Sequence, residues 1–305
     1  MVIDNYRLGV RERLGIDYAT LKAVNPRIVS CSINAYGSVG ADARLPGFDP
    51  LLQARSGMMS AQGGKGQEPV FHAIPVNDVA TAAMASFGVI AALVARETTG
   101  EGQNVETSLC AQATMFQCGE ITSYEGAAPP PDGGQDCLGF AALDRYYRCA
   151  DGWITLACVT AAQFEALAAV LGEADWPARF PQSLTESRDG PLAQAIEAAL
   201  RTHARDEIVQ LLFAAGVPAA PVYRGDEAMV QDWLWEDGFY ELRAHPLWGE
   251  LITSRAYADF SRGGAGFASL HPELGEHSLE VLLDYGIARD RIEKLAVDRV
   301  IFRAG

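Results

Sequence analysis

One carboxylate of this chain, Asp78, occupies a position at which a carboxylate is able to react. Asp78 lies between an extended apolar segment at 70–76 and a long alanine-rich helix predicted over 78–96. The free N–H groups and the positive dipole end of a helix stabilise a carboxylate. A carboxylate ionised at the carboxyl end of a strand, where α/β sheets bind ligands, is able to act as a covalent nucleophile. The alternative role is an ordinary helix N-cap, since Asp is a preferred capping residue.

The other groups of reactive residues give weaker signals. The glycine run at 63–66 lacks the upstream glycine and the Ser or Thr of a phosphate-binding loop. His271 and His277 enclose two glutamates without a diagnostic metal-ligand spacing. The six cysteines form no C-x-x-C pair. We therefore expect no metal site, and free thiols in a reducing cytoplasm.

Composition and charge narrow the classes of partner. The 305 residues are 49% hydrophobic and 21% charged, which is enough for a folded core. The net charge of −15 argues against nucleic acid and against anionic membranes. The first sixty residues nevertheless carry seven basic and five acidic side chains, so we expect a small anionic ligand to be held there. The start of the chain shows no apolar signal segment, and we interpret the apolar stretch 79–95 as a buried helix rather than a membrane span.

The pattern of elements predicts two kinds of domain. Strands at 2–3, 27–33 and 104–107 alternate with helices at 11–24, 78–96 and 108–123, which is typical of an α/β domain. A Pro- and Gly-rich stretch at 126–134 is the best candidate linker. A hairpin of 145–148 with 153–158, a capping box at Thr160 and Gln163, and further helices then predict a smaller α+β domain. Two amphipathic helices are predicted near 278–285 and 289–295.

Eight segments, in order along the chain, carry a family resemblance. They are DNYRLG at 4–9, RLGIDY at 13–18, NPRIV at 25–29, GFD at 47–49, SGMMS at 56–60, TGEGQNVETSL at 99–109, AGVPAAPV at 215–222 and LGEH at 274–277. Each segment is weak alone, but the ordered set resembles the class III (CaiB/BaiF-type) coenzyme A transferases. This family includes formyl-CoA and carnitine-CoA transferases and α-methylacyl-CoA racemase.

The resemblance implies a fold and an assembly. It implies a Rossmann-like large domain over 1–137, a small α+β domain over 138–225, and a segment 226–305 that links them and returns to the large domain. Members of the family begin with about eighty further residues that carry the first strands of the sheet. The resemblance therefore implies an N-terminally shortened large domain, or another chain that supplies the missing part. Relatives form interlocked homodimers, so a homodimer is expected.

The resemblance also implies a reaction and a site. The nucleophilic aspartate of the family falls on Asp78, which attacks an acyl-CoA thioester, with oxyanion-like stabilisation from the helix N-terminus. CoA is then passed to a carboxylic acid, so coenzyme A is part of the substrate and no cofactor is held permanently. The segments that contact CoA map to Asn5, Tyr6, Arg13, Leu14, Gly47 and Phe48. The substrate site maps to Asp49 and to Gly133, Gly134 and Gln135. Some transferases carry a mobile glycine loop at the position of residues 133–135, and the alternative role of this segment is a plain linker.

Two alternatives to CoA transfer stay open. The racemase branch uses a histidine where this chain has Phe48, and phenylalanine cannot exchange protons, so racemisation or epimerisation is disfavoured. A truncated, non-catalytic CoA-binding subunit that needs a partner chain is the other alternative. Glu101 replaces an arginine that is usual in the family's Thr-Gly-x-Gly-Gln turn.

Overall fold

The structure is a computed structural model that describes residues 1–127, 133–258, 260–263 and 270–303. It divides into two compact units, Met1–Val222 and Tyr223–Gly305. The predicted boundaries at 137 and 225, and the return of 226–305 to the large domain, stay predictions.

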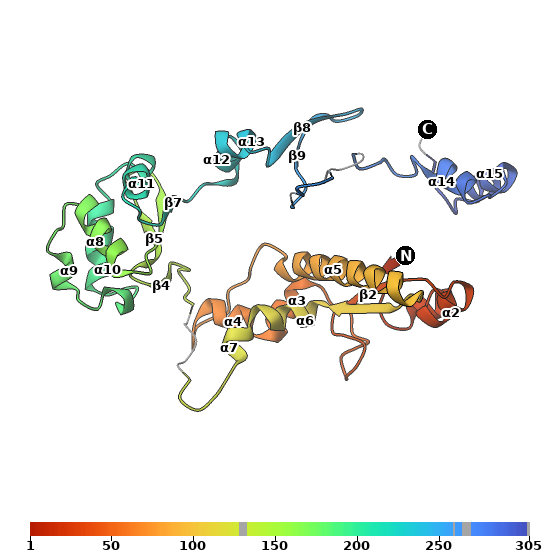
Figure 1. The fold of residues 1–305 in the computed structure, drawn as a ribbon, viewed down its shortest axis with the longest axis horizontal. Coiled ribbons are helices and arrows are strands. Elements are labelled where there is room, and N and C mark those ends of the chain that lie inside the picture. Colours follow the sequence, from red (N-terminus) through yellow and green to blue (C-terminus); the bar gives the residue numbers. More distant parts are fainter. Residues whose placement is uncertain (128–132, 259, 264–269, 304–305) are drawn as a thin grey trace. The chain divides into compact units, whose positions relative to one another are not determined.

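The first unit begins with a three-stranded parallel sheet in the order β1-β2-β3 (Figure 1). The strands are β1 (Val2–Asp4), β2 (Ser30–Asn34) and β3 (Asn104–Ser108). Helices α1 (Val10–Leu14) and α2 (Tyr18–Val24) join β1 to β2, and α3 (Asp49–Ser56), α4 (Met58–Gly63) and α5 (Val76–Thr99) join β2 to β3. Helices α6 (Leu109–Phe116) and α7 (Cys118–Ile121) follow β3. The predicted α/β alternation is confirmed.

Some predicted elements are divided or absent. The helix predicted over 11–24 is two helices, because Gly15 takes a left-handed conformation with φ 70° and ends α1. The helix predicted over 108–123 is likewise divided at Gln117. The segment before α5 forms no strand over 70–75, so Asp78 does not follow a strand directly.

Helix α5 packs one face against the sheet. Val89 and Ala92 of α5 join Val29 and Cys31 in a buried cluster. Helix α5 approaches the sheet closely at Gly88, since a Cβ added there would lie 2.8 Å from Cγ1 of Val105 on β3. This contact explains a glycine in the middle of a long helix, where it otherwise costs stability.

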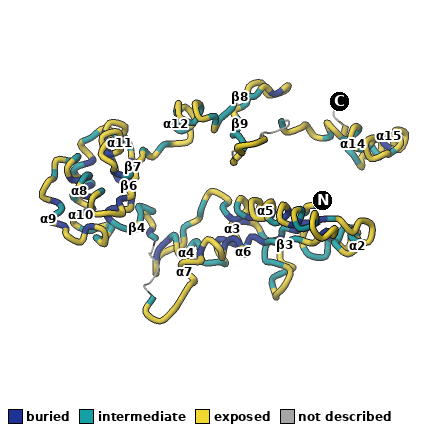
Figure 2. Tube along the Cα trace, in the orientation of Figure 1, coloured by how far each residue is buried: buried dark blue, intermediate teal, exposed yellow. Residues whose placement is uncertain are grey.

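The opposite face of α5 is apolar and exposed (Figure 2). Val79, Phe87, Ile90 and Val94 recur at helical spacing, and Phe87 is 69% exposed. The expectation of a buried helix is therefore correct for one face only. By length and composition alone, α5 is also apolar enough to cross a membrane, a property that core helices share.

A second core lies later in the same unit. Strands β4 (Gly139–Ala141), β5 (Asp144–Arg148), β6 (Trp153–Ala157) and β7 (Ala219–Pro221) form an antiparallel sheet. Helices α8 (Ala161–Val170), α9 (Trp176–Arg179), α10 (Pro191–Leu200) and α11 (Arg205–Ala214) accompany it, with buried Tyr147, Trp176 and Ile196 in the core. The predicted hairpin, with Arg148 opposite Trp153, and the capping box of Thr160 and Gln163 are confirmed.

The second unit holds short elements. They are α12 (Gly225–Met229), α13 (Asp232–Glu236), the hairpin of β8 (Tyr240–His245) and β9 (Gly249–Ser254), α14 (Ser278–Asp284) and α15 (Arg289–Val297). The last two agree with the pair of terminal helices predicted from the sequence.

Candidate active site

A cavity of about 350 Å³ opens at the carboxyl ends of the three parallel strands. Asn5 follows β1, Asn34 ends β2 and Leu109 follows β3, so every strand contributes to its lining. This is the edge at which open parallel sheets bind ligands. The complete lining is Asn5, Ile33, Asn34, Ala35, Gly47, Phe48, Asp78, Thr81, Ala82 and Leu109. The fold thus brings Asn5, Gly47, Phe48 and Asp78 together, as predicted from the sequence.

Asp78 lies in the first turn of α5 rather than at its N-cap. The helix begins at Val76, and Pro75 takes the N-cap position without a side-chain cap. The predicted capping role of Asp78 is therefore wrong, because the helix starts two residues earlier than the sequence pattern indicated. Asp78 is instead one of the residues that line the cavity.

Asp49 caps α5 instead, from the start of another helix. Its Oδ2 accepts the backbone N–H of Asn77 at 2.7 Å and that of Asp78 at 3.1 Å. Asp49 is only 2% exposed, and Gln53 Nε2 donates to its Oδ1 at 2.5 Å. The side chain of Asp49 is therefore committed to holding the helix that carries Asp78, and it does not line the cavity.

The surroundings of Asp78 oppose its ionisation. Burial raises the pKa of its carboxyl, and the charge of Asp49 raises it further. These two effects act against the helix dipole, which favours the carboxylate. The stabilisation of the Asp78 charge by the helix N-terminus stays a prediction.

The first N–H groups of α5 are also unavailable as oxyanion donors. Pro75 has no N–H, Val76 donates to the carbonyl of Ile74 at 2.8 Å, and Asn77 and Asp78 donate to Asp49. The expected stabilisation of an oxyanion by this helix end therefore lacks free donors. Within the lining of the cavity, the carboxamide of Asn5 is a donor of the required kind.

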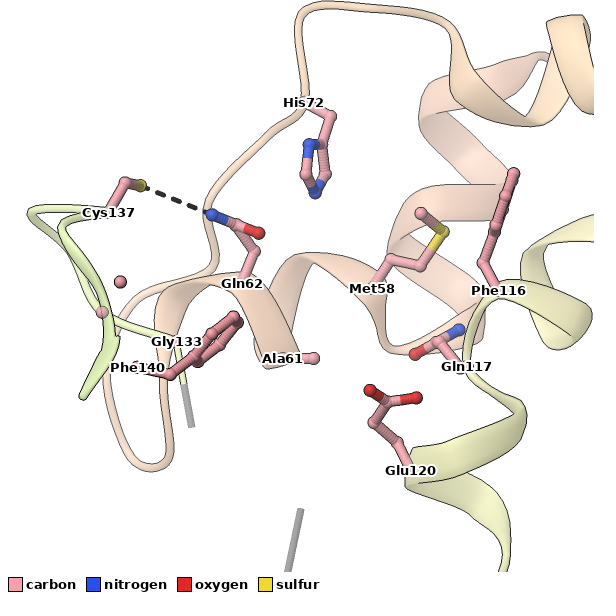
Figure 3. Close-up of a pocket in the computed structure, with 12 residues that line it drawn as sticks. Met58, Ala61, Gln62, His72, Phe116, Gln117, Glu120, Gly133, Cys137 and Phe140 are labelled. Atoms are coloured by element: carbon pink, nitrogen blue, oxygen red, sulfur yellow. Dashed lines mark hydrogen bonds between the residues drawn. The ribbon is translucent and has the colours of Figure 1, made fainter. Parts of the chain in front are cut away.

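A second cavity, of about 380 Å³, holds the predicted glycine segment (Figure 3). Gly133 and Gly134 line this cavity and not the one that contains Asp78. The N–H of Gly133 donates to the carbonyl of Ala61 at 3.1 Å, and Gln135 Nε2 donates to the carbonyl of Gly63 at 3.3 Å. The described part of the segment is therefore docked on the end of α4.

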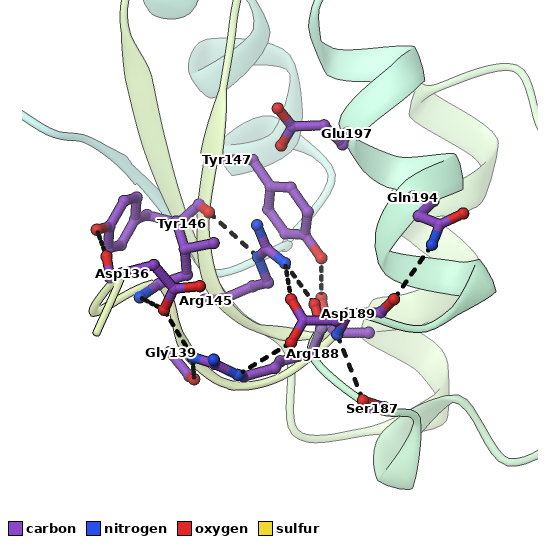
Figure 4. A network of polar contacts seen from close by, with 12 residues as sticks. Asp136, Gly139, Arg145, Tyr146, Tyr147, Ser187, Arg188, Asp189, Gln194 and Glu197 are labelled. Atoms are coloured by element: carbon purple, nitrogen blue, oxygen red, sulfur yellow. Dashed lines mark hydrogen bonds and ion pairs between the residues drawn. The ribbon is translucent and has the colours of Figure 1, made fainter. Parts of the chain in front are cut away.

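Charged residues beside the second core hold the same segment (Figure 4). Arg188 pairs with Asp136 at 2.8 Å and with Asp189 at 3.2 Å. Its guanidinium lies so close to Gly134 that a Cβ there would come within 2.5 Å of it. Buried Arg145 pairs with Asp189 at 3.7 Å and donates to the carbonyl of Arg188. The network fixes one wall of the second cavity.

Comparison of the chain with known proteins assigns it to a family. The model of CoA-transferase family III matches residues 1–278. The chain belongs to CoA-transferase family III. The family is one of enzymes that use CoA thioesters, and the fold is the class III CoA-transferase fold.

Individual relatives agree with this assignment. The chain is 25% identical to an "Acyl-CoA transferase" of Fusarium pseudograminearum, covering 99% of this chain and 67% of the relative. It is 25% identical to the alpha subunit of succinyl-CoA–L-malate CoA-transferase of Chloroflexus aurantiacus, covering 99% and 72%. A crystal structure of a CaiB/BaiF family protein from Brucella suis matches with a TM-score of 0.78 and 25% identity, over 93% of this chain and 75% of that one.

The other residues predicted to contact CoA lie outside the cavity of this CoA-transferase. Tyr6 is exposed in the loop after β1, where its N–H donates to Asp4 Oδ1 at 3.2 Å. Arg13 and Leu14 are exposed at the end of α1. Buried Arg11, which the sequence did not single out, lies 3.9 Å from Asp4 and ties α1 to the end of β1.

Sequence reasoning missed the cavity residues Asn34 and Thr81, and it missed Gln53, which supports the site from outside its lining. Gln53 is fully buried, and besides Asp49 it contacts His72 twice, accepting the N–H at 3.1 Å and donating to the carbonyl at 3.2 Å. Gln53 thus joins α3 to the segment that enters α5. Its only sequence signal is a polar residue four positions after Asp49, on the same helical face.

Proposed function

We propose that this chain transfers coenzyme A from an acyl-CoA thioester to a carboxylic acid through a covalent intermediate on Asp78. The observation that supports the proposal is that Asp78 lines a cavity at the carboxyl ends of three parallel strands. Family membership supports the class of reaction. The raised pKa of Asp78 supports its role, since a more basic carboxylate is a better nucleophile.

The reaction proceeds by four acyl transfers. A carboxylate oxygen of Asp78 attacks the thioester carbonyl, the C–S bond breaks, and a mixed anhydride and the CoA thiolate result. The thiolate attacks the aspartyl carbonyl and releases the donor acid, which leaves an aspartyl-CoA thioester. The acceptor carboxylate attacks that thioester and forms a second anhydride. The thiolate then attacks the acceptor carbonyl, which yields the new acyl-CoA and restores Asp78. The carboxamide of Asn5, which lines the cavity, is the donor that we propose for the oxyanions of these steps.

We propose that the CoA moiety is held outside the cavity by Tyr6, Arg13 and Leu14. They follow Asn5 along the chain and are exposed, which leaves them accessible to a large ligand. Arg13 suits a phosphate group. We expect Arg13→Ala to weaken CoA binding about tenfold in calorimetry, a loss in the range of one charge-assisted hydrogen bond. Arg179→Ala, at an exposed site on α9, is the matched control.

A homodimer that covers the exposed face of α5 is also proposed. Val79, Phe87, Ile90 and Val94 form a contiguous apolar stripe of the kind that marks an interface. We expect Phe87→Glu to shift the mass measured by sedimentation from dimer to monomer. An unchanged mass would contradict this part of the proposal.

We also propose that the enzyme is cytoplasmic, which its six free thiols support.

Intact-protein mass spectrometry tests the reaction. The chain is incubated with a panel of acyl-CoA thioesters and trapped with hydroxylamine, which converts an activated aspartyl group to a hydroxamate. The proposal predicts a hydroxylamine-sensitive adduct at Asp78 that Asp78→Asn abolishes and that Asp144→Asn, at an exposed position of β5, retains. An adduct that persists in Asp78→Asn, or CoA binding without any adduct, contradicts it.

A further inference from the structure

Two helices run from the cavity that contains Asp78 to the second cavity. Helix α3 follows Phe48 of the first cavity and ends just before Met58 of the second. Helix α6 likewise begins at Leu109 of the first cavity and ends at Phe116 of the second. The two helices pack against each other, and each has eight residues. An eight-residue helix is about 12 Å long, so this length separates the two cavities.

A second connection joins the two cavities. His72, which lines the second cavity, is hydrogen-bonded to Gln53, and Gln53 is hydrogen-bonded to Asp49. Asp49 in turn holds the N–H of Asp78. Hydrogen bonds through Asp49 and Gln53 therefore join residues that line the two cavities.

The lining of the second cavity favours an apolar occupant. Figure 3 shows Met58, Phe116, Phe140 and Ala61 around the hollow, with the Glu120 carboxylate beside it. Among the described lining residues there is no lysine or arginine to pair with an anion. Glu120 would repel a second carboxylate, while the aromatic and Met side chains suit a hydrocarbon chain or a ring.

We propose that the second cavity binds the far end of an elongated monocarboxylic acid, or of its CoA thioester, whose carboxyl group reacts at Asp78. The substrate class is thus an acid with an apolar end about 12 Å from its carboxyl, the separation given by helices α3 and α6. A dicarboxylic acid of equal length is selected against, because its second charge meets Glu120 and no lysine or arginine of the described lining. The assignment rests on the proposed function of Asp78, because that function places the reacting carboxyl.

Calorimetric titration of the full chain with decanoate, decanedioate and butyrate tests the assignment without turnover. Decanoate should bind at least about tenfold more tightly than either other acid, since it alone buries a long uncharged chain. Phe140→Ser should weaken decanoate binding about fivefold, whereas Phe213→Ser, at an exposed phenylalanine of α11 outside the cavity, should not. Glu120→Lys should strengthen decanedioate binding about fivefold, and the matched Glu165→Lys on α8 should leave it unchanged.

The outcomes separate this inference from the proposed function. Equal binding of decanoate and decanedioate, or decanoate binding that Phe140→Ser and Phe213→Ser affect alike, overturns the inference whatever happens at Asp78. Chain-length and variant effects as expected, but no adduct at Asp78, would keep the cavity as an apolar acid site and reject the covalent reaction. An adduct at Asp78 with only short donors would uphold the reaction and reject the elongated substrate.

Discussion

The buried carboxylate of Asp49 accepts the backbone N–H of Asp78 at 3.1 Å, while its charge raises the pKa of the Asp78 carboxyl. One side chain therefore holds the proposed nucleophile in place and makes it more basic. Because Asp49 belongs to α3 and Asp78 to α5, the relationship depends on how two distant helices pack.

Replacing Asp49 by Asn should lower the pKa of Asp78 toward its ordinary value. The amide oxygen of Asn still accepts the N–H groups of α5, its NH2 group replaces the oxygen that accepted from Gln53, and the repulsion between two carboxylates is lost. The acid limb of the rate of adduct formation at Asp78 should therefore move to lower pH, which mass spectrometry of the trapped adduct at a series of pH values measures. Asp175→Asn, at an exposed aspartate before α9, should leave the profile unchanged. An acid limb that stays in place in Asp49→Asn would show that Asp49 does not control the ionisation of Asp78.

Asp78→Asn should make the fold more stable at neutral pH. The folded-state pKa of Asp78 is raised, so its ionisation opposes folding at pH values above both the folded and the unfolded pKa. The variant removes this penalty, and its gain in the free energy of unfolding should disappear below about pH 3.9, where the unfolded carboxyl is protonated too. Urea unfolding of both proteins at pH 7 and at low pH checks the sign. A gain that grows as the pH falls would contradict the raised pKa.

One residue of the candidate site was predictable from a local element, and others only from the family resemblance. Asp78 was singled out because a long helix begins beside it, whereas Asn5, Gly47 and Phe48 were mapped from the resemblance, and the fold gathers all four in one cavity. The capping of α5 by Asp49 was not predictable, since it joins residues almost thirty positions apart and leaves no periodic signal. The place of Gly133 and Gly134 in a separate cavity likewise depends on long-range packing against α4.

The same distinction holds for the fold. The parallel strands, the hairpin of β5 and β6 and the capping box at Thr160 follow from short-range patterns and were predicted. The exposed face of α5 was not, because a helix that is apolar all round is normally buried on every side. Which face the sheet covers is set by tertiary packing at Gly88, and no local pattern encodes it.

Gln53→Ala should destabilise the fold by about 2–4 kcal/mol, because it leaves a cavity and removes the donors and acceptor that join Asp49 to His72. The loss also leaves the buried charge of Asp49 with fewer partners. Urea unfolding measures the change. Gln194→Ala, at an exposed glutamine that donates to the carbonyl of Asp189, should change stability by no more than about 0.5 kcal/mol. Equal effects of the two substitutions would show that the Gln53 bridge adds nothing.

Gly133→Ala should loosen the wall of the second cavity. A Cβ at this position would lie 2.2 Å from the carbonyl oxygen of Gln62 and 2.5 Å from that of Ala61, and neither backbone atom can move aside freely. The cost of such overpacking is about 1–3 kcal/mol. Hydrogen exchange of the Gly133 amide, which donates to Ala61, should become faster as the segment undocks from α4. The binding of decanoate should weaken in parallel, because Gly133 and Phe140 belong to the same wall.

Gly225→Ala is the matched control for this effect, since a Cβ there meets no atom within 4 Å and its backbone is not in the left-handed region. It should leave both the exchange rate and the binding of decanoate unchanged. If Gly133→Ala accelerated exchange without weakening binding, the glycine segment would be a structural contact of α4 and not part of the ligand site. Loss of binding without faster exchange would instead show that the added methyl group occupies the space of the ligand itself. Both results are distinguishable from the expected joint change, in which docking of the glycine segment forms the wall that binds the acid.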